Sequence, residues 1–303
     1  MKILVTGGLG VIGRALTAEL EGRGHEVWVC DLYQHDHARY IRCDVSESRQ
    51  LAVLFVDHEF DCVYHLAAEF GRHNGEAYYE NLWSTNVIGT KNILRLQQEH
   101  RFRLVFFSSS EVYGDYDGLM SEEVMEQYAI RQLNDYAMTK WVNEMQVLNA
   151  AAMYGTETVR VRLFNVYGPG EYYSPFRSAI CIFCYCALMG LPYKVYLRHH
   201  RTSLFIADAV STLGNIVDRF QPGQVYNIGG SEYHDMKQVS DLILRQMGRS
   251  DSIVEYVEQE PWTTHAKKVD IRKAGLYLDH QPKISLAQGI IMTLEWMKTV
   301  YIR

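Results

Sequence analysis

Two short segments of the sequence carry side chains that can transfer protons. Tyr136 and Lys140 lie four residues apart in a segment with helical spacing of apolar residues, so both are expected on one helix face. A lysine charge beside a phenol favours the phenolate, which would let Tyr136 act as a general base or acid near neutral pH. Ser109, Ser110 and Glu111 follow a short apolar run and are expected at the carboxyl end of a strand. Ser, Tyr and Lys together predict a proton-transfer site, and a solvated helix face is the alternative for the Tyr and Lys pair.

A glycine loop near the start of the sequence predicts a dinucleotide site. Gly7, Gly10 and Gly13 are spaced G-x-x-G-x-x-G between a predicted strand and a predicted helix. Glycines in this place allow a tight turn and close approach of a pyrophosphate to the helix N-terminus. Asp31 ends the next strand, where a carboxylate accepts both ribose hydroxyls and repels a 2′-phosphate. NAD is therefore predicted over NADP, whereas a simple glycine turn and a plain strand-end acid are the alternatives.

The elements that position these residues alternate between strand and helix. Apolar runs at 3–6, 27–30, 62–65, 104–107 and 159–164 predict buried strands, and 12–21, 87–98 and 136–154 have helical spacing. This rhythm predicts an α/β fold with a Rossmann-type, doubly wound parallel sheet over residues 1–168. Helices near 176–188, 207–220 and 236–247, with strands near Val195 and Val225, predict a smaller substrate-binding lobe within 169–303. Some later segments of residues 169–303 are expected to belong to the first domain.

Composition narrows the class of protein further. The chain has 303 residues, a net charge of −6 and a sequence pI of about 6.1, so nucleic acid and membrane surfaces are not expected partners. The longest apolar run, 179–191, is too short to cross a bilayer, and no leader segment precedes the glycine loop, so a cytoplasmic location is expected. No metal is expected either, because Cys181, Cys184 and Cys186 lack a second ligand cluster and are interpreted as core. The 35–37 segment and the 199–200 histidine pair are interpreted as solvated.

Together with His65-Leu66-Ala67-Ala68 and Asn165-Val166-Tyr167-Gly168-Pro169-Gly170, these motifs resemble the extended short-chain dehydrogenase/reductase family over essentially the whole chain. The resemblance implies that Tyr136 takes the proton of a nucleotide sugar's 4-hydroxyl as NAD accepts the hydride. It also implies a homodimer through the helices at 87–98 and 136–154. Arg201 would hold the diphosphate and Tyr193 and Tyr196 would line the base pocket. The further residues that it implies are Val11, Ile12, Asp44, Val45, Leu66, Ala67, Ala68 and Asn86 for the cofactor, and Glu69, Arg72 and Asn165 for the substrate.

Glu111 is used to choose the reaction within this family. Dehydratases and UDP-glucuronate decarboxylases resemble this chain in carrying Glu before Val-Tyr-Gly, and Glu111 can take the C5 proton of a 4-keto sugar. We therefore expect a 4,6-dehydratase first, a UDP-glucuronate-type decarboxylase second and a 4-epimerase third. Ser110 departs from the dTDP-glucose dehydratases, which carry Asp there. A strand-end acid without a catalytic role is the alternative for Glu111, and a non-catalytic nucleotide-binding protein or a net reductase is the alternative for the chain.

Overall fold

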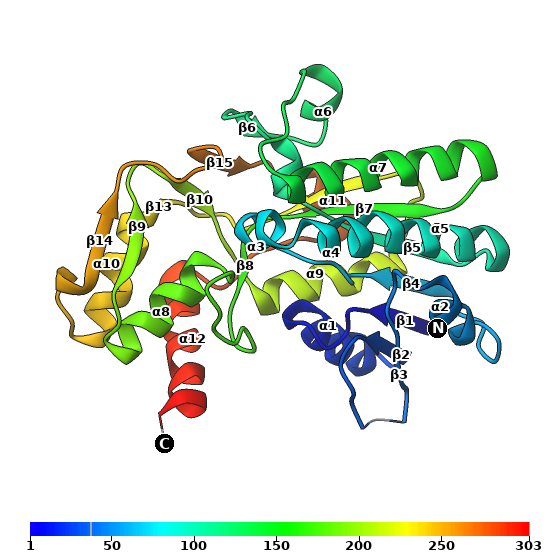
Figure 1. Ribbon diagram of the computed structural model, residues 1–303, viewed down its shortest axis with the longest axis horizontal. Coiled ribbons are helices and arrows are strands. Elements are labelled where there is room, and N and C mark those ends of the chain that lie inside the picture. The colour runs from blue at the N-terminus through cyan, green and yellow to red at the C-terminus, as the bar shows by residue number, and fades with distance from the viewer. Residues whose placement is uncertain (37, 303) are drawn as a thin grey trace.

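The computed structural model describes residues 1–36 and 38–302, and its centre is a seven-stranded parallel sheet (Figure 1). The strand order is β12-β7-β5-β4-β1-β2-β3, and every neighbouring pair is parallel. This doubly wound sheet confirms the predicted fold class. The strands of the sheet are β1 (Lys2–Thr6), β2 (Glu26–Asp31), β3 (Tyr40–Arg42), β4 (Cys62–His65), β5 (Arg103–Ser109), β7 (Thr158–Leu163) and β12 (Val225–Ile228).

Helices cover both faces of this sheet because nearly every strand residue is buried. The cluster of apolar side chains on one face includes Leu16 and Leu213, and the cluster on the other includes Leu51, Ile93 and Val147. The first face is covered by α1 (Val11–Gly22), α9 (Ile206–Asp218) and α11 (Arg272–Leu278), and the second by α2 (Ser48–Leu54), α5 (Gly89–His100) and α7 (Asp135–Tyr154). Short segments lead into α5 and α7: α3 (Arg72–Ala77), α4 (Tyr79–Trp83), the π-helix Ser84–Ile88, the 3₁₀ turn Ser110–Tyr113 and α6 (Val124–Gln127).

A smaller lobe lies beyond the carboxyl ends of the strands, at the left of Figure 1. Its helices are α8 (Ala179–Met189), α10 (Met236–Met247) and α12 (Leu286–Tyr301), with a 3₁₀ turn at Asp251–Ile253. A four-stranded sheet of order β13-β10-β15-β6 and two strand pairs complete it. These strands are β6 (Leu119–Met120), β10 (His200–Thr202), β13 (Tyr233–Asp235) and β15 (Ala266–Val269), with the pairs β8 (Val166–Tyr167) and β11 (Leu204–Phe205), and β9 (Tyr193–Tyr196) and β14 (Val254–Val257).

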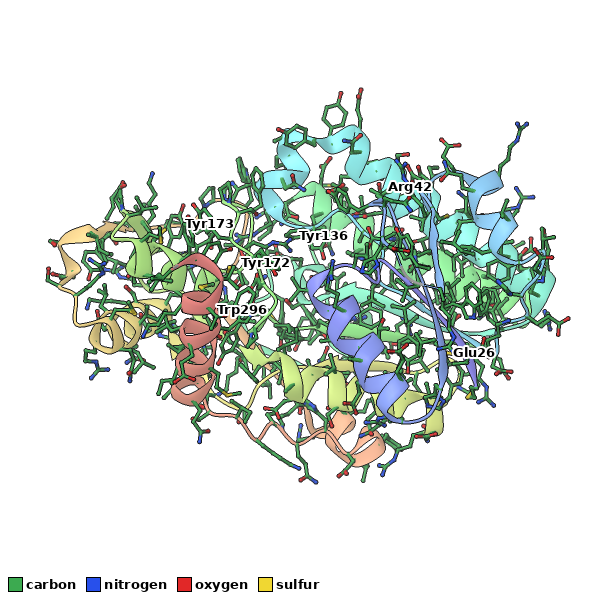
Figure 2. All side chains as sticks on the ribbon, turned by 90° about the horizontal axis from the view of Figure 1, so that it is seen from below. Glu26, Arg42, Tyr136, Tyr172, Tyr173 and Trp296 are labelled. Atoms are coloured by element: carbon green, nitrogen blue, oxygen red, sulfur yellow. The ribbon has the colours of Figure 1, made fainter. Side chains whose placement is uncertain are left out.

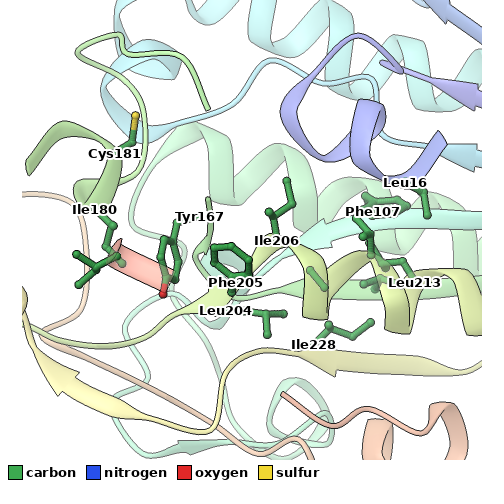
Figure 3. Close-up of a cluster of buried hydrophobic side chains, with 14 of the residues drawn as sticks. Leu16, Phe107, Tyr167, Ile180, Cys181, Leu204, Phe205, Ile206, Leu213 and Ile228 are labelled. Carbon is green, nitrogen blue, oxygen red and sulfur yellow. The ribbon is translucent and has the colours of Figure 1, made fainter. Parts of the chain in front are cut away.

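The two parts share one core, so the second lobe is not an independent unit. Tyr167 and Phe205 stand edge to face and connect Leu213 of the large sheet's helix layer with Ile180 of α8 (Figure 3). The three cysteines of α8 are buried in this region, as predicted for core residues. A shared apolar core fixes the second lobe over the edge of the sheet and therefore fixes the space between them.

The structure differs from the sequence-based elements at their ends. Helix α8 begins at Ala179 rather than at 176, because the Ser178 side chain accepts a hydrogen bond from the Cys181 amide and caps it. The strand near Val225 pairs with β7 and so forms the edge of the large sheet, and β3 was not predicted because it has only three residues. None of the helices in the described part of the chain is long and apolar enough to span a bilayer.

Candidate active site

A cavity of about 820 Å³ separates the carboxyl edge of the large sheet from the second lobe. Figure 2 places Tyr136 near the middle of the molecule, with Tyr172, Tyr173 and Trp296 on the side of the second lobe. Ligands of open parallel sheets bind at this edge. Most of the predicted site residues line the cavity: Gly7, Gly10, Val11, Ile12, Gly13, Asp31, Asp44, Val45, Leu66, Ala67, Ala68, Glu69, Arg72, Ser109, Ser110, Glu111, Tyr136, Lys140, Asn165, Tyr196 and Arg201.

The backbone of the glycine loop has no space for side chains at Gly7 and Gly13, which leaves the loop open to a dinucleotide. Gly7 has a φ of +69°, and a Cβ on Gly13 would lie 2.3 Å from the Gly7 carbonyl oxygen. The Asp31 carboxylate accepts a hydrogen bond from the Leu9 amide at 2.9 Å, which ties the loop to the end of β2. This cradle, open to the cavity, fits the pyrophosphate and ribose of NAD.

Two predicted site residues do not line the cavity. Asn86 is buried in the π-helix, where its side chain bonds both backbone groups of Glu69, so it shapes the loop that carries Glu69. The prediction that Tyr193 lines the base pocket is wrong, because its side chain is buried and its hydroxyl lies 2.7 Å from Ser240 Oγ. Alternation along β9 explains this, since Tyr193 and Val195 face the core while Lys194 and Tyr196 face outward.

The proton-transfer residues meet at the end of β5. Ser109 and Tyr136 both line the cavity, and the Lys140 ammonium donates to the Phe107 carbonyl oxygen at 2.8 Å. Burial raises the pKa of Tyr136 to about 12 and lowers the pKa of Lys140 to about 8. Tyr136 is therefore a neutral phenol at pH 7, and the phenolate that the sequence suggested is not the form favoured in this structure.

Glu111 is held by two cations rather than standing alone. Its Oε1 lies 2.5 Å from Lys267 Nζ and 3.8 Å from Arg72 Nε. Burial by itself would raise the pKa of Glu111, but Lys267 and Arg72 outweigh it and lower the pKa to about 2. Glu111 is consequently an ionised, compensated carboxylate, which makes it a weak base and no proton donor at neutral pH.

A second carboxylate completes this group of charges. Glu260 accepts from Arg72 Nη2 at 2.7 Å and from Arg201 Nη2 at 3.5 Å. We call the five residues Arg72, Glu111, Arg201, Glu260 and Lys267 the cavity cluster. The sequence analysis missed Glu260 and Lys267, because Glu258-Gln259-Glu260 and Lys267-Lys268 have the appearance of surface charge runs.

His199 corrects another expectation from the sequence. It is buried rather than solvated and its Nε2 accepts from the Glu260 amide at 3.2 Å, while burial lowers its pKa to about 4. Asn165 has a φ of +40° and donates to the Thr202 carbonyl oxygen at 3.0 Å. Of the 35–37 segment, His37 lies outside the described residues. Within 1–36 and 38–302, no group of three or more His, Cys, Asp or Glu side chains is placed to hold a metal ion.

Comparison with known proteins identifies the family. The family described as "NAD dependent epimerase/dehydratase family" matches residues 3–229. The UDP-N-acetyl-alpha-D-glucosaminuronate decarboxylase of Bacillus cytotoxicus is 30% identical, and the match covers 99% of this chain and 98% of that protein. The dTDP-glucose 4,6-dehydratase 1 of Escherichia coli is 27% identical over 98% of this chain and 92% of that protein. The structure of MoeE5 in complex with UDP-glucuronic acid and NAD is 26% identical, with a TM-score of 0.88 over 99% of this chain and all of that one. The chain belongs to the NAD dependent epimerase/dehydratase family and is an enzyme that modifies a nucleotide sugar with NAD as its cofactor.

Proposed function

We propose that the enzyme removes carbon dioxide from a nucleoside-diphosphate uronate after C4 of the sugar has been oxidised. The observation that carries this proposal is the pairing of Glu111 with Lys267 at 2.5 Å and with Arg72 at 3.8 Å. Both partners stabilise the carboxylate over the carboxylic acid. Held in its ionised form, Glu111 is a weak base for the C5 proton and cannot be the acid for a departing hydroxyl.

Dehydration and decarboxylation place different demands on the site. Loss of water from C5 and C6 needs a base for the C5 proton and an acid for the departing hydroxyl. Ser110 stands where the resembling dTDP-glucose dehydratases carry Asp, and Glu260 is itself ion-paired with Arg72. A 4-keto uronate needs neither group: the bond between C5 and C6 breaks, its electrons move toward the C4 carbonyl, carbon dioxide leaves and C5 takes a proton from solvent.

The chain's own residues then have distinct roles. The glycine loop and Asp31 would hold NAD, which would supply reversible hydride transfer at C4. Tyr136 exchanges a proton with the 4-hydroxyl oxygen and hydrogen-bonds the carbonyl oxygen while carbon dioxide leaves. Lys140 is fixed by the Phe107 carbonyl oxygen behind the tyrosine, and Arg201 binds the diphosphate.

The relatives support this choice over the dehydratase that the sequence favoured. The Bacillus cytotoxicus protein acts on a uronate, and UDP-glucuronic acid decarboxylase 1 of Xenopus tropicalis is also 30% identical over 98% of this chain and 72% of that protein. Dehydration remains the second candidate function, because Glu69 follows Ala67-Ala68 as in the resembling dehydratases and because the Escherichia coli dehydratase is 27% identical. Epimerisation would use the same Tyr136 without any loss of mass.

Mass spectrometry of the products separates these reactions. We expect that the enzyme with NAD converts UDP-glucuronate to a product lighter by carbon dioxide and leaves UDP-glucose and dTDP-glucose unchanged. A product lighter by one water from either glucose substrate would instead establish a dehydratase and return Glu111 to the role of base. An unchanged mass with altered retention would mean epimerisation. Tyr136→Phe is the control, since it should abolish all three reactions.

We also propose that the enzyme is a homodimer through α5 and α7. These helices and the π-helix before α5 expose several large apolar residues, namely Ile88, Met145, Leu148 and Met153, each 40 to 69% accessible. Two copies packed through this face would remove that surface from water. Light scattering should give twice the chain mass, and Leu148→Asp should shift it toward the monomer. A wild-type monomer at micromolar concentration would contradict the proposal.

A further inference from the structure

One donor of the Arg72 guanidinium has no acceptor in the protein. Nη1 is buried and makes no hydrogen bond to any described residue, whereas Nη2 donates to Glu260 at 2.7 Å. The side chain lines the cavity at the start of α3. A buried guanidinium N–H without a partner is costly, because water has been removed and nothing replaces it. We expect the acceptor for the Arg72 Nη1–H group to be on the ligand.

The place of Arg72 indicates which part of the ligand this is. Its Nε lies 3.8 Å from Glu111, whose amide donates to Ser109 Oγ at 3.2 Å, and Ser109 lines the cavity together with Tyr136. Arg72 therefore lies at the end of the cavity where the proton-transfer residues act. The group that reaches it belongs to the sugar rather than to the nucleotide base.

The charges around Arg72 favour an anion over a hydroxyl group. Lys267 already compensates Glu111 at 2.5 Å, and Glu260 is shared between Arg72 and Arg201. Burial keeps the neighbouring His199 neutral at pH 7 by lowering its pKa to about 4. Three cations against two carboxylates leave the cavity cluster with one positive charge. A guanidinium with a free N–H and surplus positive charge is suited to a carboxylate.

We propose that Arg72 binds the sugar carboxylate and thereby makes the enzyme select uronates over neutral sugars. The inference rests on the proposed function for its substrate class, and it adds the residue that recognises that class. Glu260 accepts from Nη2 of Arg72 and from Arg201, which leaves Nη1 of Arg72 as the donor without a partner in the described part of the chain.

The test compares binding of UDP-glucuronate and UDP-glucose to the NAD-loaded enzyme by calorimetry. We expect the wild-type enzyme to bind UDP-glucuronate at least ten times more tightly. Arg72→Met should weaken UDP-glucuronate binding by about 10- to 100-fold, the value of a charge-assisted hydrogen bond, and change UDP-glucose binding less than threefold. Arg72→Lys should keep part of the preference, because the charge remains while the planar fork is lost. Arg198→Met, an exposed arginine before β10, is the matched control and should leave both affinities unchanged.

Several outcomes would overturn the inference. One is a wild-type enzyme that does not prefer UDP-glucuronate, and another is an Arg72→Met variant that weakens both ligands equally, which would place Arg72 on the diphosphate. Arg177 also lines the cavity and has a buried Nε without a partner among the described residues. Loss of the preference in Arg177→Met but not in Arg72→Met would assign the carboxylate to that residue. Product analysis is independent: a uronate-selective enzyme that releases no carbon dioxide would refute the proposed function and leave the role of Arg72 intact.

Discussion

Two groups of buried charges in this enzyme are built in opposite ways. The first, which we call the core cluster, consists of Ser108, Tyr113, Glu144, Arg160 and Arg162 beneath the large sheet. Glu144 accepts four hydrogen bonds there, and each nitrogen of the Arg162 guanidinium has an acceptor. In the cavity cluster, by contrast, Arg72 Nη1 has no partner among the described residues.

The difference separates a structural role from a ligand-binding one. A fully paired cluster gains nothing from a ligand and loses much when one partner is removed. The cavity cluster tolerates the loss of Arg72 better, because Glu111 keeps Lys267 and Glu260 keeps Arg201. The core cluster ties α7 to β5 and β7 and so holds Tyr136 and Lys140 over the sheet. The cavity cluster lies where we propose that the sugar binds.

The strongest test of this contrast is Glu144→Ala. The substitution leaves Arg160 and Arg162 buried without their carboxylate, so we expect the free energy of unfolding to fall by about 3–5 kcal/mol in urea titrations. Arg72→Met should cost much less, because Glu260 keeps its contact with Arg201. Glu99→Ala, at an exposed position of α5, serves as the control for loss of a carboxylate. An equal loss of unfolding free energy in Glu144→Ala and Arg72→Met would contradict the contrast between the two clusters.

Two tyrosines sharpen the contrast at the level of a single hydroxyl group. Tyr136→Phe should lower kcat by about 100-fold or more without a change in stability, because its hydroxyl serves the substrate. Tyr113→Phe should do the reverse: its hydroxyl bonds Asn227 at 2.7 Å and Arg162 at 3.0 Å, so its loss costs about 1–3 kcal/mol of stability with kcat kept. Turnover and thermal unfolding of both variants are the measurements, and a catalytic loss confined to Tyr113→Phe would reverse the assignments.

The cofactor end of the site could be predicted because its residues are close in sequence. A strand, a glycine loop and a helix follow one another, and the geometry that NAD needs is encoded in which residues are glycine. The same reasoning placed Tyr136 and Lys140 on one helix face. The predicted strands lie within a residue or two of those in the sheet, since strands buried on both faces are continuous apolar runs.

The cavity cluster could not be predicted in the same way. Its residues come from α3, the turn after β5, β10, the loop after β14 and β15, and only the folded chain brings them together. Lys267 is the clearest case: beside Lys268 it has the sequence of a solvated pair, yet alternation along β15 buries one lysine and exposes the other. The sequence therefore did not show that Lys267 pairs with Glu111, on which the proposed reaction depends.

The pH dependence of stability tests the pairing of Glu111. Its pKa of about 2 lies below the ordinary value, so the ion pairs stabilise the fold above about pH 4.5 and lose that contribution as the pH falls toward 2. Lys267→Met leaves Arg72, Arg201 and Tyr136 facing Glu111, and the burial penalty then raises the pKa of Glu111. We expect acid unfolding of this variant to begin at a higher pH than in the wild type.

The matched control for this variant is Lys268→Met. Lys268 is the exposed neighbour on the same strand, with its ammonium 5.8 Å from the centre of the Tyr233 ring. Its replacement removes the same charge from the chain without approaching Glu111, so the pH at which acid unfolding begins should not move. Identical acid unfolding of Lys267→Met and the wild type would show that Lys267 does not set the ionisation of Glu111.

The smallest expected effect concerns the two tyrosines of β9. Tyr193→Phe removes the 2.7 Å contact with Ser240 in the core, so it should cost about 1 kcal/mol of stability and leave the KM for the nucleotide sugar unchanged. Tyr196→Phe, three residues along on the cavity side, should show the opposite pattern, with stability kept and KM raised. Because side chains three residues apart lie on opposite faces of a strand, the contrast tests the alternation along β9, in which Tyr193 is buried and Tyr196 is half-buried. A raised KM in Tyr193→Phe would place its hydroxyl at the ligand and would return β9 to the role that the sequence suggested.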